Sequence, residues 1–342
     1  MFRLYEKINN GGLYFIAEMS ANHGGSLDNA LEIVRKAKDA GADCVKIQTY
    51  NADTMTLNTD GPDFKITGGQ WDGYNLYRLY EYAATPYEWH EPIKRECEKA
   101  GIDFFSTPFD KSSVDFLEGL GVGAYKVASY ELVDIPLIRY IASKNKPMII
   151  STGMGSVSEI QDCVDACKEE GNEQIVLLKC CSEYPAPWQD MKLGNIPDMK
   201  EKWGYPVGLS DHSFGSLGAI VGVSLGACVV EKHVKLEGVE SADAAFSMSF
   251  EEYGSMVRDC ISAKTIAAGP DYSLTASEQS STVFRRSIYA ATEICEGDEF
   301  TETNVRVVRP GYGLKPKYYQ ELLGRKAKRD IHFGERITME DL

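Results

Sequence analysis

The sequence lacks a long hydrophobic run, a C-x-x-C cysteine pair and an excess of basic side chains. It has no stretch of about 18 consecutive apolar residues, and its start, MFRLYEKINNGGLYF, lacks the apolar core of a signal peptide. The 36 lysines and arginines are outnumbered by 51 aspartates and glutamates, giving a net charge of −15. This excludes the basic surface that nucleic-acid binding requires. We therefore expect neither nucleic acid nor a membrane as a partner.

The nine cysteines are few for a disulfide framework and do not have the spacing of a zinc ribbon. Their number is odd, and they are spread along the chain. We expect reduced thiols and a cytoplasmic protein. The adjacent Cys180 and Cys181 have no partner at a spacing that would mark a catalytic nucleophile.

No G-x-G-x-x-G follows the first predicted strand, which argues against a dinucleotide-binding fold. What the chain has instead is a repeated unit of short β-branched run, polar turn and helical stretch. Eight such strands are predicted, at 14–20, 43–49, 103–107, 124–129, 147–152, 175–181, 205–211 and 228–234. Eight units in roughly 260 residues predict a closed parallel (β/α)8 TIM barrel.

Helices are predicted between the strands, among them 27–40, 86–100, 156–170, 217–225 and 250–268. Ser26 and Ser156 stand at helix starts, and Gly41, Gly101 and Gly171 follow helix ends, as capping residues do. The connection 51–85 is much longer than the others, and its aromatic residues, Trp71 among them, favour an ordered lid.

The repeated strand–turn–helix pattern ends near residue 270, which suggests a second domain. We expect the barrel at 1–269, a polar linker at 270–283 and a small β-rich domain at 284–342.

Polar side chains close all eight predicted strands, where TIM-barrel enzymes place their reacting groups. Lys46 and Lys126 are flanked by serine and threonine hydroxyls, a set suited to a phosphate or carboxylate. An alternative is that these lysines only form salt bridges with Glu18 or Glu231.

Histidine is scarce, and two of the five histidines, His212 and His233, close consecutive strands. Adjacent barrel strands bring such residues close together, so the pair could hold a divalent metal ion with positions open for a substrate.

At these residues the sequence resembles the sialic acid synthases, the NeuB family. The matching stretches are IAEMSANHGGSLDNALEIVRKAKDAGADCVKIQTY, FFSTPFDKSSVDFL, AYKVASYELVDIPLI, MIISTGMGS, LLKCCSEYPAP, GLSDHSFG and VEKHV. The tail resembles the antifreeze-like (SAF) domain of that family. WDGYNLYRLYEYAATPYEWH, VFRRSIY and RPGYGLKPKYYQELLGRKAKRDI are most similar to the pseudaminic acid branch.

The resemblance implies condensation of phosphoenolpyruvate with an open-chain N-acetylated hexose, giving a nine-carbon 2-keto acid and phosphate. It implies Mn²⁺ or Mg²⁺ on His212 and His233. The implied phosphoenolpyruvate contacts are Lys46, Thr107, Lys126, Ser129, Ser151 and Ser210. The implied sugar contacts are Gln48, Tyr184 and Asp243. Glu18 is expected beside the reacting centre, and Glu231 joins it and the two lysines as a candidate catalytic residue.

The resemblance also implies that Arg309 enters the barrel of a second subunit in a domain-swapped homodimer. Two positions depart from the neuraminic acid synthases, which have asparagine at Ser182 and phenylalanine at Arg285. Both positions are expected near the sugar. The stretch GVESADAAFSM, which contains Asp243, also lacks their Gly-Pro-Asp form.

Three alternatives remain open on the sequence. The enzyme could use another sugar, as an N-acetylneuraminic or legionaminic acid synthase. It could be a Schiff-base aldolase with Lys126 or Lys46 as nucleophile. It could also be a non-catalytic sugar-binding or scaffold protein on the same barrel.

Overall fold

The computed structural model describes residues 2–69 and 71–341. The chain divides between Ala268 and Gly269 into two compact units. No helix within the described residues is long and apolar enough to cross a membrane.

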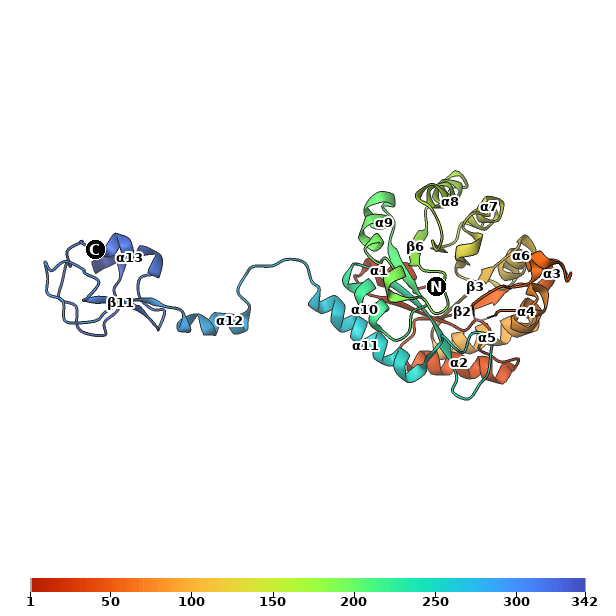
Figure 1. Cartoon of the computed structure of the whole chain (residues 1–342), viewed down its shortest axis with the longest axis horizontal. Coiled ribbons are helices and arrows are strands. Elements are labelled where there is room, and N and C mark those ends of the chain that lie inside the picture. Colours follow the sequence, from red (N-terminus) through yellow and green to blue (C-terminus); the bar gives the residue numbers. More distant parts are fainter. Residues whose placement is uncertain (1, 70, 342) are drawn as a thin grey trace. The chain divides into compact units, whose positions relative to one another are not determined.

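The first unit is a closed barrel of eight parallel strands, as predicted (Figure 1). Each strand pairs with the next along the chain, and β1 also pairs with β8, which closes the ring. The strands are β1 (Tyr14–Glu18), β2 (Cys44–Thr49), β3 (Asp103–Pro108), β4 (Tyr125–Val127), β5 (Met148–Ser151), β6 (Ile175–Cys180), β7 (Val207–Asp211) and β8 (Val229–Lys235). A two-residue strand, β9 (Met248–Ser249), pairs with the end of β8.

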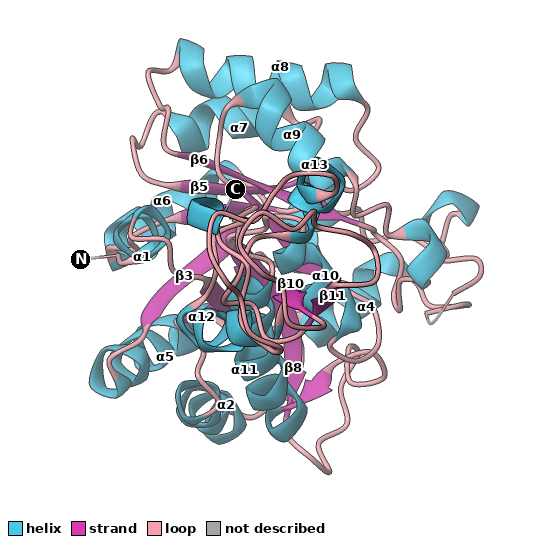
Figure 2. Cartoon of the chain, turned by 90° about the vertical axis from the view of Figure 1, so that its left-hand side faces the viewer, coloured by secondary structure: helices cyan, strands magenta, loops and turns pink. Residues whose placement is uncertain are grey.

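Helices lie outside the ring of strands (Figures 1 and 2). They are α2 (Leu27–Asp39), α5 (Tyr87–Ala100), α6 (Lys111–Leu120), α7 (Ile135–Ala142), α8 (Val157–Glu169), α9 (Asn195–Trp203), α10 (Leu217–Ser224) and α11 (Phe250–Ile266). The short helix α1 (Leu4–Asn9) packs instead against the apolar cluster inside the barrel. The predicted caps are present: the hydroxyls of Ser26 and Ser156 accept hydrogen bonds from backbone amides three residues on. Gly101 caps α5 with φ of 68°, a left-handed conformation that favours glycine.

The alternation of side chains along the strands explains why the barrel has an apolar floor and a polar mouth. Tyr14 and Ile16 of β1 belong to the apolar cluster inside the barrel, and Glu18 is the next residue on the same face. The same step leads from Cys44 to Lys46 on β2. It recurs on β3, β4, β5 and β8, where Phe105, Ala124, Ile149 and Val229 are followed on the inner face by Thr107, Lys126, Ser151 and Glu231. The polar residues therefore converge at the carboxyl ends of the strands.

The described residues of the long connection 51–85 form several short elements. It contains α3 (Ala52–Met55), a single 3-10 turn and α4 (Leu76–Ala83). Between them, Lys65 pairs with Asn75 across a short antiparallel bridge.

The second unit has its own small core. It contains α12 (Ala276–Ser281), the antiparallel pair β10 (Ser287–Ala290) and β11 (Val305–Val308), and α13 (Tyr319–Leu322). Part of the segment expected as a linker, 270–283, is thus helical. A Thr275 capping box accounts for the start of that helix.

Candidate active site

A buried cluster of opposite charges occupies the mouth of the barrel. The Lys46 ammonium lies 2.7 Å from Oε2 of Glu18 and 3.6 Å from Oε1 of Glu231, and it donates to the Thr107 hydroxyl at 3.2 Å. Glu231 also accepts a hydrogen bond from Ser210. The alternative of salt bridges to Glu18 and Glu231 is therefore present in the structure, but as part of one network with the hydroxyls.

Burial and mutual contact shift the pKa values of these groups in opposite directions. Burial raises the pKa of Glu18 to about 7, although Lys46 opposes the shift. Burial acts the same way on Glu231, but the ammonium groups of Lys126 and Lys46 outweigh it and lower the pKa of that carboxyl. One carboxylate is thus held ionised while the other can exchange a proton near neutral pH, an arrangement suited to acid–base chemistry.

Lys126 is the second buried cation at the mouth. Its ammonium donates to the Ser151 hydroxyl at 2.6 Å and to the Val127 carbonyl at 2.9 Å. Burial and the nearby Lys46 lower the pKa of Lys126. No carboxylate within the described residues forms an ion pair with Lys126, so the site can accept an anionic ligand there.

His212 and His233 lie side by side, with ring centroids 5.4 Å apart. The Nδ1–H of His212 donates to the Cys181 carbonyl at 2.9 Å, so Nε2, which lies 3.5 Å from the Ser210 hydroxyl, carries the lone pair. Nδ1 of His233 is buried and has no hydrogen-bond partner among the described residues. Both imidazoles thus offer a nitrogen of the type that binds a divalent ion. Within residues 2–69 and 71–341 they are not joined by a third His, Cys, Asp or Glu that would complete an all-protein cluster.

The predicted sugar contacts form a second hydrogen-bonded group next to Glu18. Gln48 donates to Ser20 at 3.2 Å, and Ser20 donates to Asp243 at 2.5 Å. The Tyr184 ring lies against His212 with centroids 4.2 Å apart. Gln48, Asp243 and Tyr184, distant in sequence, therefore meet at one side of the mouth.

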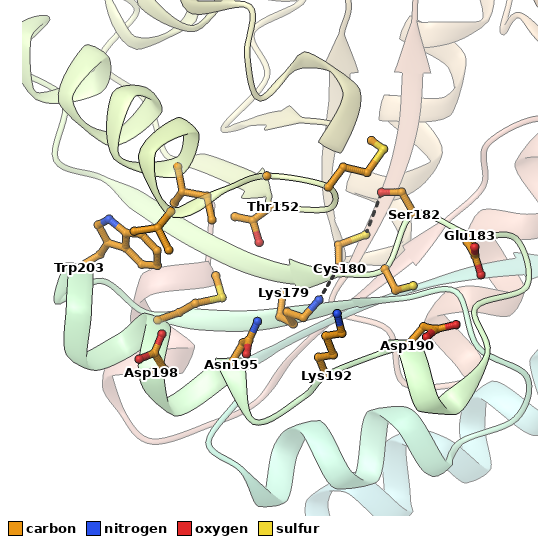
Figure 3. A pocket seen from close by; sticks show the side chains of 16 residues that line it. Thr152, Lys179, Cys180, Ser182, Glu183, Asp190, Lys192, Asn195, Asp198 and Trp203 are labelled. Atoms are coloured by element: carbon orange, nitrogen blue, oxygen red, sulfur yellow. Dashed lines mark hydrogen bonds between the residues drawn. The ribbon is translucent and has the colours of Figure 1, made fainter.

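Two of the predicted serines lie at the rim between β4 and β6. Ser129 accepts a hydrogen bond from the Gly153 amide, and Ser182 lies 3.9 Å from the Cys180 sulfur. Ser182 also lines a pocket of about 400 Å³ between the ends of β5 and β6 and helices α8 and α9 (Figure 3). Lys179 and Lys192 point into this pocket. Lys179 faces away from the barrel interior because it alternates with Cys180 along β6.

Sequence reasoning missed Glu131 and the pairing of Cys180. Oε2 of Glu131 is buried without a partner, and burial raises the pKa of this carboxyl to about 7. Glu131 lies just beyond β4, in the 3-10 turn Ser129–Glu131, and this position after a strand end could have marked it as a candidate site residue. Cys180 lies 3.8 Å from Nδ1 of His212, and this contact outweighs burial and lowers the pKa of the thiol to about 7.

A buried ion pair fixes β7 to β8 directly behind the two histidines. Asp211 and Lys232 are register partners on these strands, and Nζ of Lys232 lies 2.9 Å from Oδ2 of Asp211. Asp211 also accepts from the amide and hydroxyl of Ser213. Because His212 follows Asp211 and His233 follows Lys232, the pair sets the positions of both imidazoles.

Replacing Lys232 with methionine is expected to lower the free energy of unfolding by about 3–5 kcal/mol, because Asp211 would remain buried without its counter-ion. Urea denaturation of the full chain measures the change. Lys202→Met, which removes an exposed pair with Asp198, is the matched control and should cost less than about 0.5 kcal/mol. Equal effects of the two substitutions would contradict the structural importance of the buried pair.

Residues 33–271 match the NeuB family, and residues 285–342 match the SAF domain. The chain belongs to the NeuB family. It is 47% identical to the pseudaminic acid synthase of Campylobacter jejuni over 96% of both chains. It is 32% identical to the N,N'-diacetyllegionaminic acid synthase of Legionella pneumophila, over 96% of this chain and 94% of that protein.

Structural comparison agrees with the family match. The crystal structure of an N-acetylneuraminic acid synthetase from Leptospira borgpetersenii, in complex with citrate, has a TM-score of 0.71 and 30% identity. The superposition covers 79% of this NeuB-family chain and 90% of the synthetase chain.

Arg309 and Arg285 belong to the second unit, so their distance from the barrel mouth is not defined. Both side chains are exposed. Arg285 lines a pocket in the second unit, together with Arg286, Lys315 and Lys317.

Proposed function

We propose that this protein condenses phosphoenolpyruvate with 2,4-diacetamido-2,4,6-trideoxy-L-altrose to give pseudaminic acid and phosphate. The observation that carries the proposal is the convergence of two buried ammonium groups and two imidazoles in one barrel mouth, in a chain 47% identical to a pseudaminic acid synthase. The lower identity to the legionaminic acid synthase favours the pseudaminic product over this alternative.

Phosphoenolpyruvate binds through the cations and hydroxyls that line the polar mouth of the barrel. Lys126, with Ser151, supplies donors to one anionic group, and Lys46, with Thr107, supplies donors to another. Ser129 and Ser210 add hydroxyls at the edge of this set. Because the donors are already fixed by the strands, little reorganisation is needed when the anion binds.

The sugar binds beside the histidines, with Gln48 and Asp243 on its polar side and Tyr184 against its face. His212 and His233 would hold a divalent ion, Mn²⁺ or Mg²⁺, through imidazole nitrogens. When bound, this ion supplies Lewis-acid polarisation of the sugar aldehyde.

In the reaction, C3 of the enolpyruvate bonds to the aldehyde carbon and a water oxygen bonds to C2. Phosphate then leaves C2 by C–O cleavage, so the balance is phosphoenolpyruvate, sugar and water to 2-keto acid and phosphate. Glu18 is placed to take a proton from the water or to give one to the new alkoxide, since its pKa lies near 7. Glu231 stays ionised and, together with the closer Glu18, raises the pKa of Lys46 against the effect of burial.

The test is phosphate release with purified protein, phosphoenolpyruvate, Mn²⁺ and a panel of N-acetylated hexoses, with products identified by mass spectrometry. The nine-carbon acid should form fastest from the diacetamido trideoxy altrose. Borohydride trapping with pyruvate should give no covalent adduct, whereas an adduct would favour the Schiff-base aldolase. Absence of phosphate release with every sugar would favour a non-catalytic protein.

We also propose a domain-swapped homodimer in which Arg309 serves the barrel of the other subunit, as the family resemblance implies. Arg309→Ala and Lys126→Ala are each expected to be nearly inactive alone when phosphoenolpyruvate is kept near the wild-type KM. Co-expressed, they should form heterodimers with one intact site and recover roughly a quarter of the wild-type rate. If Arg309 serves its own barrel instead, both sites of every heterodimer are defective and the rate does not recover.

A further inference from the structure

An aromatic wall lies over the two histidines. It consists of Trp71, Tyr184 and Phe246. Centroid distances are 5.9 Å from Trp71 to Tyr184, 6.3 Å from Trp71 to Phe246 and 5.0 Å from Tyr184 to Phe246. Tyr184 and Phe246 in turn lie 4.2 Å from the His212 ring and 5.0 Å from the His233 ring. The wall is therefore continuous with the candidate metal ligands.

Trp71 reaches this place from far away in the sequence. It comes from the connection between β2 and α5, whereas Tyr184 follows β6 and Phe246 follows β8. Its indole Nε1 donates to the Ala242 carbonyl at 3.1 Å, next to Asp243 of the polar group. The turn that carries it is closed by backbone hydrogen bonds between Ile66 and Tyr74 and between Gly73 and Ile66. The Trp71 ring is thus held at the mouth by its own hydrogen bond to Ala242 and by the backbone hydrogen bonds that close its turn.

The sugar site presents two kinds of surface. Gln48, Ser20 and Asp243 offer hydrogen bonds. The adjoining aromatic wall, which the Trp71–Ala242 hydrogen bond joins to this polar group, offers apolar faces. Methyl and acetamido groups bind favourably to such faces and hydroxyl groups do not, because a hydroxyl there loses its hydrogen bonds with water. The proposed substrate carries a C6 methyl and two acetamido methyls. N-acetylmannosamine has hydroxyls at C4 and C6 instead.

We propose that Trp71 is a specificity-determining residue that closes the aromatic wall and selects deoxy, diacetamido hexoses over hexoses with free hydroxyls at C4 and C6. The inference rests on the proposed function and adds to it the residue that recognises the apolar substituents. Among the described residues, the hydrogen bond and the ring contacts of Trp71 involve neither Lys46 nor Lys126, so its loss should leave phosphoenolpyruvate binding intact.

The experiment is a competition assay with the full-length protein, saturating phosphoenolpyruvate and Mn²⁺. The diacetamido trideoxy altrose and N-acetylmannosamine are mixed, and mass spectrometry of the two nine-carbon products gives the ratio of their kcat/KM values. Trp71→Ala should lower this ratio about 30-fold, because one apolar wall of the pocket is lost. The KM for phosphoenolpyruvate should remain within about threefold of wild type.

Two variants control the result. Trp71→Phe keeps an aromatic face and should retain most of the discrimination, which separates the apolar surface from the Nε1 hydrogen bond. Trp188→Ala removes a tryptophan that is 61% exposed and lies outside the wall, and should leave the ratio unchanged. An unchanged ratio in Trp71→Ala, or an equal loss with both sugars, overturns the inference while the proposed function stands. Wild-type protein that converts neither sugar overturns the proposed function, and this inference with it.

Discussion

His233→Ala is expected to lower kcat at least about a thousandfold, because removal of one of two imidazole ligands removes the Lewis acid from the sugar aldehyde. His233 offers a buried, unpaired Nδ1 next to His212, and nothing else in the described residues replaces it in a metal cluster. The measurement is turnover against Mn²⁺ concentration after treatment with a chelator. Isothermal titration with Mn²⁺ provides a second readout that does not depend on activity.

His332→Ala is the matched control for this substitution. The side chain of His332 is 79% exposed and pairs with Glu293 in the second unit, so its loss should leave Mn²⁺ binding and turnover unchanged. Wild-type activity of the His233 variant in the presence of chelator would refute the assignment of the metal site. Circular dichroism of both variants establishes that the fold is retained.

Lys126→Ala is expected to raise the KM for phosphoenolpyruvate about a hundredfold, while the KM for the sugar changes less than about threefold. The reason is that Lys126 is a buried cation that forms no ion pair with a carboxylate of the described residues and is held by Ser151 and a backbone carbonyl. In the Lys126→Ala variant, a bound anion lacks the charge-assisted hydrogen bond from the lysine, and water cannot replace this bond in a buried site. Steady-state kinetics with each substrate varied in turn measures the two constants.

Lys179→Ala is the matched control for Lys126→Ala. Lys179 is also a buried lysine at the end of a barrel strand, and burial lowers its pKa too, but it points outward into the pocket beside α8 and α9 (Figure 3). Its loss should leave the KM for phosphoenolpyruvate within about threefold of wild type. Equal effects of the two substitutions, or equal effects of Lys126→Ala on both substrates, would contradict an anion site at Lys126.

The barrel could be predicted because its signals are local. Each strand is a short β-branched run, each helix has an amphipathic pattern with a cap such as Ser156, and both signals depend on neighbouring residues only. The strand boundaries were less accurate: β4 was expected to reach Ser129 but ends at Val127, where its ladder with β5 ends and a 3-10 turn begins. The residue at which a strand ends depends on its hydrogen bonds to the neighbouring strand. The sequence of the strand alone does not carry this information.

The candidate site was predictable to the extent that it follows from alternation. Once Tyr14 and Ile16 face inward, Glu18 must as well, and the same argument places Lys46 and Lys126. Asp243 could not be placed this way, because it lies in an irregular loop, and hydrogen bonds from the Ser20 hydroxyl and the Ala21 amide hold its carboxylate at the mouth. Glu131 escaped notice for the same reason: it follows a strand but belongs to a turn.

The eightfold βα repeat, the inward direction of the polar residues at the strand ends and the family resemblance can all be read from the amino-acid order. The contacts between these groups become visible in the folded chain. Lys46 lies between two carboxylates, whereas Lys126 forms no ion pair with a carboxylate of the described residues, and the Trp71 ring lies beside Tyr184. The physical reason is that periodicity fixes the face on which a side chain lies, whereas distances across a closed barrel depend on strand register and loop path, which are properties of the whole fold.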